Sequence, residues 1–121
     1  MKRFLLALLF SVSFGLVATT AHAETRMYRC DITRRPIDSL NWVLVFATNF
    51  PAGSNGSAIG WCQNEVNHEA VDYCDGRDSG GFLLKYKVYR YGNPSDRSSY
   101  YIAIETVEWV CRDGWPYYAN E

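Results

Sequence analysis

Four cysteines constrain this chain more than any other feature of its sequence. Cys30, Cys62, Cys74 and Cys111 all follow an N-terminal segment that is typical of a secretory signal. An even number of cysteines in a small exported protein predicts a disulfide framework, because such compartments keep thiols oxidised. We therefore expect two disulfides, which would staple a small fold.

The predicted signal peptide occupies residues 1–23. It has a positively charged start, an apolar stretch from Phe4 to Val17, and the small-residue cleavage pattern Ala21-His22-Ala23. Cleavage of the 121-residue chain there would leave 98 residues, the length of a single domain over 24–121. No later stretch approaches the ~20 apolar residues that a membrane helix needs. We expect a protein of the periplasm or a secreted protein, without a membrane span.

Four cysteines allow three pairings, and we favour Cys30–Cys111 with Cys62–Cys74. In the chain-entropy model the long loop would contribute at most ~4.5 kcal/mol and the short loop at most ~3 kcal/mol. The short pairing conflicts with a helical reading of the segment between its cysteines, because a continuous helix would separate them by ~18 Å. A disulfide needs Cα atoms within ~7 Å.

The segment from Cys62 to Cys74 therefore has two interpretations. Helical spacing joins its apolar positions, which are Ile59, Cys62, Val66, Ala70 and Tyr73. Asn64 and Asn67 are weak helix formers, however. We favour a segment that doubles back near Asn67-His68 with one or two helical turns at most. A real helix whose cysteines pair elsewhere is the alternative.

Two early stretches have strand character. Met27 to Thr33 alternates, with Tyr28, Cys30 and Ile32 on its apolar side. Asn41 to Phe50 is β-branched and aromatic on both faces, which predicts a central strand. Pro51 to Gly60 reads as a loop, and we interpret its Asn55-Gly56-Ser57 sequon as turn chemistry.

The clearest element is a long hairpin. Phe82 to Tyr89 would pair with a return strand from Ser99 to Cys111, across a turn at 93–96. A register with Lys85 opposite Glu105 would place Tyr86 against Ile104 and Val88 against Ile102, giving one apolar face. A bulge at Thr106 to Glu108 would then turn Trp109 and Cys111 inward.

A short last strand is expected from Trp115 to Ala119, where Pro116 suits a sheet edge. These patterns predict a mainly β fold, or an α+β fold with one short helix. The architecture would be a small antiparallel sheet or barrel stapled by two disulfides.

Charge and composition argue against several chemistries. Without Lys2 and Arg3 the chain has 10 basic and 13 acidic side chains, a poor balance for nucleic-acid binding. One histidine, His68, remains after the signal, in a polar stretch that does not favour catalysis. The cysteines do not have the C-x-x-C spacing of a zinc site. The spacing of Asp72, Asp75 and Asp78 does not match a calcium-binding loop. We predict a non-enzyme without metal or cofactor.

Aromatic residues are abundant, with four tryptophans and nine tyrosines. Trp42 and Trp109 are expected in the core. Exposed Tyr and Trp make rigid, amphipathic contact surfaces. The residues that we predict as a binding surface, with plain packing as the alternative, are Tyr89, Tyr91, Tyr100, Tyr101, Trp115, Tyr117 and Tyr118.

Charged residues are unevenly distributed along the chain, which can steer a partner of complementary charge. The early basic group consists of Arg26, Arg29, Arg34 and Arg35. The central acidic group consists of Glu65, Glu69, Asp72, Asp75 and Asp78. Two solvated faces with no partner are the alternative interpretation.

The tail from Trp109 to Glu121 (WVCRDGW, then YANE) resembles the C-terminus of the periplasmic colicin M immunity proteins. Chain length and the early cysteine, Cys30, are also similar. The resemblance implies an exported single domain with its first and last cysteines bonded, which binds a toxin. Two features depart from that family: the strand-like stretch 41–50 stands where it has helices, and Cys62 and Cys74 are additional.

These observations favour an exported, non-catalytic protein-binding domain. It would be an inhibitor or immunity protein directed at a toxin or an envelope enzyme. A secreted carbohydrate-binding or adhesin-like module, binding a glycan through exposed Trp and Tyr, is the first alternative. A small secreted hydrolase that uses a carboxylate pair is the second.

Overall fold

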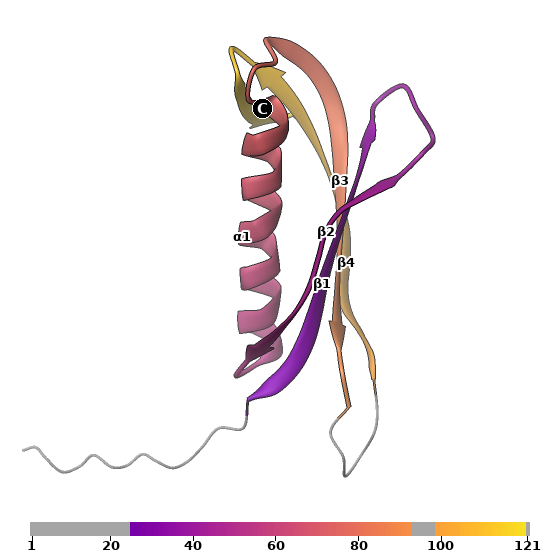
Figure 1. Ribbon diagram of the computed structural model, residues 1–121, viewed down its shortest axis with the longest axis vertical. Helices are drawn as coiled ribbons and strands as arrows, with labels where there is room; N and C mark the ends of the chain where they lie inside the picture. The colour runs from indigo at the N-terminus through magenta and orange to yellow at the C-terminus, as the bar shows by residue number, and fades with distance from the viewer. Residues whose placement is uncertain (1–24, 93–98, 121) are drawn as a thin grey trace, which may run out of the picture.

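A computed structural model describes residues 25–92 and 99–120 of the chain (Figure 1). Within them the chain forms a five-stranded antiparallel sheet and one α-helix. The predicted signal peptide and the hairpin turn at 93–96 lie outside the described residues. The antiparallel sheet stapled by two disulfides confirms the predicted fold class, as an open sheet and not a barrel.

The strands are not arranged in chain order. The sheet order is β2-β1-β3-β4-β5, with every neighbouring pair antiparallel. The elements in chain order are β1 (Arg26–Pro36), β2 (Val43–Ala52), α1 (Asn55–Cys74), β3 (Ser79–Arg90), β4 (Tyr100–Arg112) and β5 (Trp115–Tyr118). Figure 1 shows α1 lying along one face of this sheet.

The helix is the largest departure from the sequence prediction. α1 runs unbroken for 20 residues, so both the doubled-back segment and the loop predicted up to Gly60 were wrong. Ser54 caps the helix by accepting a hydrogen bond from the backbone N–H of Ser57. A buried stripe at four-residue spacing fixes it to the sheet: Ala58, Cys62, Val66, Ala70 and Cys74. Burial of this stripe outweighs the low helix propensity of its asparagines.

The favoured disulfide pairing was also wrong. All four cysteines are bonded as predicted, but Cys30 pairs with Cys62 and Cys74 with Cys111. The Cα atoms are 5.7 and 5.4 Å apart in the two bridges, whereas a helix separates Cys62 from Cys74 by ~18 Å. The two bridges indicate an oxidising, extracytoplasmic compartment. Among the described residues, no helix is long and apolar enough to cross a membrane.

The hairpin forms, but its register differs by one residue from the prediction. Lys85 lies opposite Thr106, and Tyr86 lies opposite Glu105. The irregularity falls beside Val88 and Tyr89, and not at Thr106 to Glu108. Trp109 and Cys111 are buried, so the odd-numbered positions in this part of β4 point into the core. Ile104 therefore lies on the other face, with 56% of its surface exposed.

β2 lies at an edge of the sheet and is not the central strand that was predicted. Its ten residues carry no charge, and a continuous run of uncharged residues is the pattern expected of a central strand. One side of β2 is covered, because Trp61 of α1 stacks on Phe50 at a centroid distance of 4.2 Å. The other side is open, and Leu44 is exposed.

β5 occupies the opposite edge of the sheet, as Pro116 suggested. The turn before it is a two-residue hairpin, in which Asp113 and Gly114 have φ values of 54° and 79°. Positive φ at both positions is what a type I′ turn requires.

The core lies between α1 and the sheet. Tyr28, Cys30 and Ile32 point into it from β1, as predicted, and Trp109 is also buried there, 6% exposed. Trp42, expected in the core, is instead partly exposed and precedes β2. Among the described residues no element covers the opposite side of the sheet (Figure 1).

Candidate functional site

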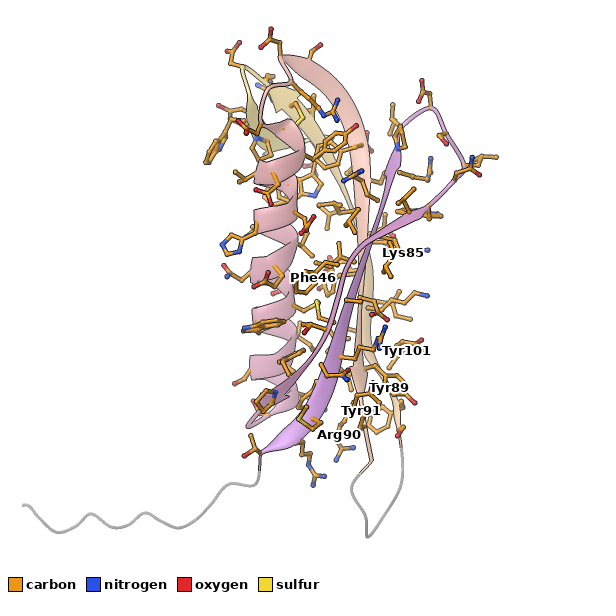
Figure 2. The ribbon with its side chains drawn as sticks, viewed as in Figure 1. Phe46, Lys85, Tyr89, Arg90, Tyr91 and Tyr101 are labelled. Carbon is orange, nitrogen blue, oxygen red and sulfur yellow. A yellow bond between two sulfur atoms is a disulfide. The ribbon has the colours of Figure 1, made fainter. Side chains whose placement is uncertain are left out.

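The uncovered side of the sheet is called the open face below. Side chains alternate along a strand, so the register determines which residues share this side. The open face is made by Arg29, Asp31 and Thr33 of β1, Leu44, Ala47 and Asn49 of β2, Lys85, Lys87 and Tyr89 of β3, and Tyr101, Ile104 and Thr106 of β4. Figure 2 shows Lys85, Tyr89 and Tyr101 pointing away from α1, while Phe46 lies on the helix side.

Three tyrosines form a cluster at one end of the open face. Tyr89 meets Tyr91 edge to face at a centroid distance of 5.1 Å, and meets Tyr101 similarly at 5.0 Å. The β4 irregularity brings Tyr101 directly opposite Tyr89. Half of Tyr101 (51%) remains exposed. Edge-to-face packing holds these rings in place without burying them, which suits a contact surface.

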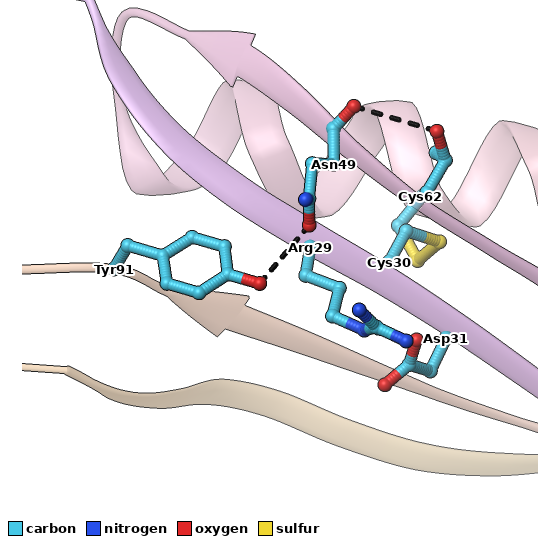
Figure 3. Close-up of polar contacts among 7 residues, drawn as sticks. Arg29, Cys30, Asp31, Asn49, Cys62 and Tyr91 are labelled. Carbon is cyan, nitrogen blue, oxygen red and sulfur yellow. Dashed lines mark hydrogen bonds and ion pairs between the residues drawn. A yellow bond between two sulfur atoms is a disulfide. The ribbon is translucent and has the colours of Figure 1, made fainter.

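Polar contacts anchor the cluster to the edge of the sheet. The Tyr91 hydroxyl donates a 3.0 Å hydrogen bond to Oδ1 of Asn49 on β2 (Figure 3). On the strand between them, Arg29 Nε donates to Asp31 Oδ1 over 2.7 Å. Hydrogen bonding to Asp31, and then to Tyr91, raises the pKa of Arg29. The charge of Asp31 is thus engaged by its neighbour on the same strand.

Two lysines continue the surface from the tyrosine cluster. Lys85 Nζ lies 4.5 Å from the ring centre of Trp42, and Arg35 Cζ lies 5.2 Å from the same ring. Lys87 Nζ lies 5.8 Å from the ring of Tyr101. Neither lysine forms an ion pair with any residue that the structure describes. A shallow recess of about 260 Å³ opens between these side chains.

The recess combines cationic and aromatic groups. Lys85, Lys87, Trp42 and Tyr101 line it, together with the engaged Asp31. Unpaired ammonium groups attract carboxylates, and neighbouring rings supply apolar contact area. The arrangement can hold an acidic surface segment in place. In the described part of the chain, no group of His, Cys, Asp or Glu side chains could hold a metal ion.

The predicted binding residues do not form one surface. Tyr89, Tyr91 and Tyr101 come together, whereas Tyr100 turns away and accepts a 2.8 Å hydrogen bond from Arg90. The tail aromatics lie at the other end of β4, where Tyr118 stacks on Trp109 at 4.6 Å. The remaining two, Trp115 and Tyr117, belong to β5 beside it.

Sequence reasoning did not include Trp42, Lys85, Lys87 or Ile104 in the binding surface. Lys85 was expected to pair with Glu105, but the register places Glu105 on the helix side, opposite Tyr86. A signal was present, because Lys85, Lys87 and Tyr89 alternate with buried residues along β3. The contact between Trp42 and Lys85 joins segments distant in the chain, and no local pattern indicates it.

Charge is divided between the two sides of the molecule. α1 contains Glu65, Glu69 and Asp72 and has no lysine or arginine. Burial first, and then the charge of Asp72, raises the pKa of Glu69. Exposed His68 lies 3.8 Å from Glu65. The two unpaired lysines belong to the open face, whereas these acidic side chains belong to α1.

The early arginines divide between these two sides. Arg29 and Arg35 lie with the open-face groups, whereas Arg34 lies on the helix side, 4.6 Å from the ring centre of Tyr73. Arg77 is 4.2 Å from the same ring. The predicted basic group is therefore not one patch.

Comparison of the chain with protein-family models, with curated proteins and with solved structures found no match.

Proposed function

We propose that the protein is a non-catalytic binding domain that acts in the periplasm or outside the cell as an inhibitor or immunity protein. Its partner would be a toxin or an envelope enzyme that presents an acidic surface to the open face. The observation that carries this proposal is the continuity of the Tyr89–Tyr91–Tyr101 cluster with the unpaired Lys85 and Lys87.

Residue types support a protein partner. Interface centres are rich in Tyr, Trp and Arg, which combine apolar area with polar tips. Tyr101 and Ile104 offer exposed apolar area beside the lysines, and α1 keeps the opposite side rigid through two disulfides. A rigid platform loses little conformational entropy on binding.

Charge supports an acidic partner. Lys85 and Lys87 add two positive charges to one side of β3, and opposite charge on the partner would accelerate association. Resemblance of the tail to colicin M immunity proteins is consistent with a toxin as the partner. The extracytoplasmic compartment is where such a toxin would be met.

The test is capture from an envelope extract with the immobilised, disulfide-bonded protein. We expect one stoichiometric acidic protein, recovered by the wild type and lost by the double variant Lys85→Glu/Lys87→Glu and by Tyr101→Ala. Arg112→Glu reverses one positive charge outside the recess and should retain the protein. Purified partner should associate more slowly as salt increases.

Capture that survives both open-face variants would contradict the proposal. So would a partner whose association rate does not depend on salt, because the lysines would then have no steering role.

A further inference from the structure

A second surface lies on the opposite side of the sheet, between α1 and strands β4 and β5. Two cavities of about 400 and 270 Å³ adjoin there and share Asn67, Trp109 and Tyr118 in their walls. We call the two together the helix-side groove. Figure 1 shows the C-terminal half of α1 beside β4 and β5. The size of the groove falls within the range of small-ligand sites.

One wall of the groove is polar, and hydrogen bonds fix the positions of its side chains. Gln63 Nε2 donates to the Tyr86 hydroxyl over 2.9 Å, and that hydroxyl donates to Glu105 Oε1 over 2.6 Å. These bonds orient the carboxylate of Glu105. They leave its second oxygen, and the side-chain carbonyl of Gln63, available to a ligand. Burial raises the pKa of Tyr86, so the phenol stays a donor. The Asn67 side chain makes no hydrogen bond to the described residues.

The other wall is aromatic. Tyr118 lies against Trp109 with an interplanar angle of 29° and is still 43% exposed. Trp109 is buried, and its indole N–H has no acceptor among the described residues. Buried donors without a partner are rare and are commonly completed by a water or a ligand atom.

From this wall and the polar wall, we propose that the helix-side groove binds a short neutral oligosaccharide. A sugar ring has a flat C–H face, which stacks on an aromatic ring, and hydroxyls that both donate and accept hydrogen bonds. Tyr118 supplies the ring, and Asn67, Gln63 and Glu105 supply complementary acceptors and donors. The proposal is independent of the open face, which lies across the sheet.

A cationic peptide is the competing ligand, because Glu105 is charged and aromatic rings attract cations. The groove favours the sugar, since its single carboxylate is already engaged by Tyr86 and two side-chain amides stand beside it. Amides recognise neutral hydroxyls and acetamido groups, and add nothing to the binding of a cation that a carboxylate does not supply.

The test titrates the disulfide-bonded, isotope-labelled protein with the N-acetylglucosamine trimer, cellotriose and maltotriose, each to about 10 mM, which detects millimolar Kd values. We expect at least one sugar to shift the NMR signals of Asn67 and of the Trp109 indole. Asn67→Ala, on an exposed helix position, should weaken binding about three- to tenfold. Tyr118→Ala should abolish it.

Tyr101→Ala is the matched control, because it removes an exposed tyrosine from the open face and should leave the sugar affinity unchanged. The proposal is overturned if none of the three sugars shifts these signals. It is also overturned if trilysine shifts them and the sugars do not, or if Asn67→Ala and Tyr118→Ala bind sugar as the wild type does. Capture of the protein partner should be retained by Tyr118→Ala, so the two proposals fail separately.

Discussion

Tyr86 donates its hydroxyl hydrogen to Glu105 over 2.6 Å and so connects a buried residue of β3 to an exposed carboxylate of β4. Gln63 of α1 donates a hydrogen bond to the hydroxyl oxygen of Tyr86. Side chains of α1, β3 and β4 therefore meet at the phenol of Tyr86. Burial is the main reason that the pKa of Tyr86 is raised, and the bond to Glu105 adds to it. The folded protein favours the neutral phenol.

Replacing Tyr86 by Phe should therefore change how stability depends on pH. Because the folded pKa lies above the unfolded value, the stabilising contribution is complete below a pH of about 10 and is lost as pH rises through the folded pKa. Tyr86→Phe should cost about 1 kcal/mol near neutrality, through the lost hydrogen bonds, and should lose less stability at alkaline pH. Urea unfolding at neutral and alkaline pH measures both effects. Tyr101→Phe is the control, and equal alkaline losses in wild type and Tyr86→Phe would contradict the prediction.

Mapping of disulfide-linked peptides should recover Cys30 with Cys62 and Cys74 with Cys111. The bridges span 32 and 37 residues, so removing either pair should cost a similar amount, at most about 4 kcal/mol. Their loops do not overlap, and the two costs should be nearly additive. Denaturant unfolding of Cys30→Ala/Cys62→Ala and Cys74→Ala/Cys111→Ala gives the values. A peptide that joins Cys30 to Cys111 would refute the fold.

Glu69→Gln should stabilise the protein at neutral pH. Burial and the charge of Asp72 raise the pKa of Glu69, so its charged form is disfavoured in the folded state. The wild type therefore loses stability as pH rises through the folded pKa of Glu69. The glutamine variant has no charge at this position and does not lose that stability. The gain in Tm should disappear below a pH of about 4. Glu108→Gln on β4 controls for the removal of a charge, and a gain independent of pH would speak against this cause.

Gly114→Ala should destabilise the β4–β5 turn. Gly114 has a φ of 79°, a conformation that costs an alanine about 1 kcal/mol. Because this turn holds β5, the near-UV signal of the Trp109–Tyr118 stack should also weaken. Gly53→Ala is the matched control, since no atom lies within 4 Å of its added Cβ and its φ is not positive. Equal stability of the two variants would show that the turn tolerates a side chain.

Local periodicity predicted much of the fold. The alternation of Tyr28, Cys30 and Ile32 identified the inward side of β1, and the same pattern from Phe82 to Val88 identified that of β3. Side-chain alternation is a property of the strand itself, and so it is visible without a partner. The helical stripe through Val66 was visible too, but an incorrect disulfide pairing led to a shorter helix.

Long-range pairing was not predictable. Three cysteine connectivities fit the same sequence, and the correct one requires knowing that Cys30 and Cys62 meet across β1 and α1. The β3–β4 register was decided by Trp109 and Cys111 at the far end of β4, and not by the two isoleucines nearer the turn. A shift of one residue reverses the side of every residue in a strand, which is why Ile104 became exposed.

The candidate site was predictable in part for the same reason. Tyr89, Tyr91 and Tyr101 are near one another in the hairpin, so their cluster follows from local pairing. Trp42 joins Lys85 only because β2 folds back along β1, and because β1 in turn pairs with β3. That contact depends on two long-range strand pairings, and local sequence patterns show neither of them.

Both disulfides end on α1, which divides the covalent chain into two closed rings joined by the helical segment between Cys62 and Cys74. A protease that cuts once inside either ring, at 31–61 or 75–110, releases no fragment. A single cut between the rings would separate two halves, each with its own bridge. That connecting segment is entirely helical, with its backbone hydrogen bonds formed. The stretch whose cleavage would separate the two disulfide-bonded halves is therefore among the hardest for a protease to unfold and reach.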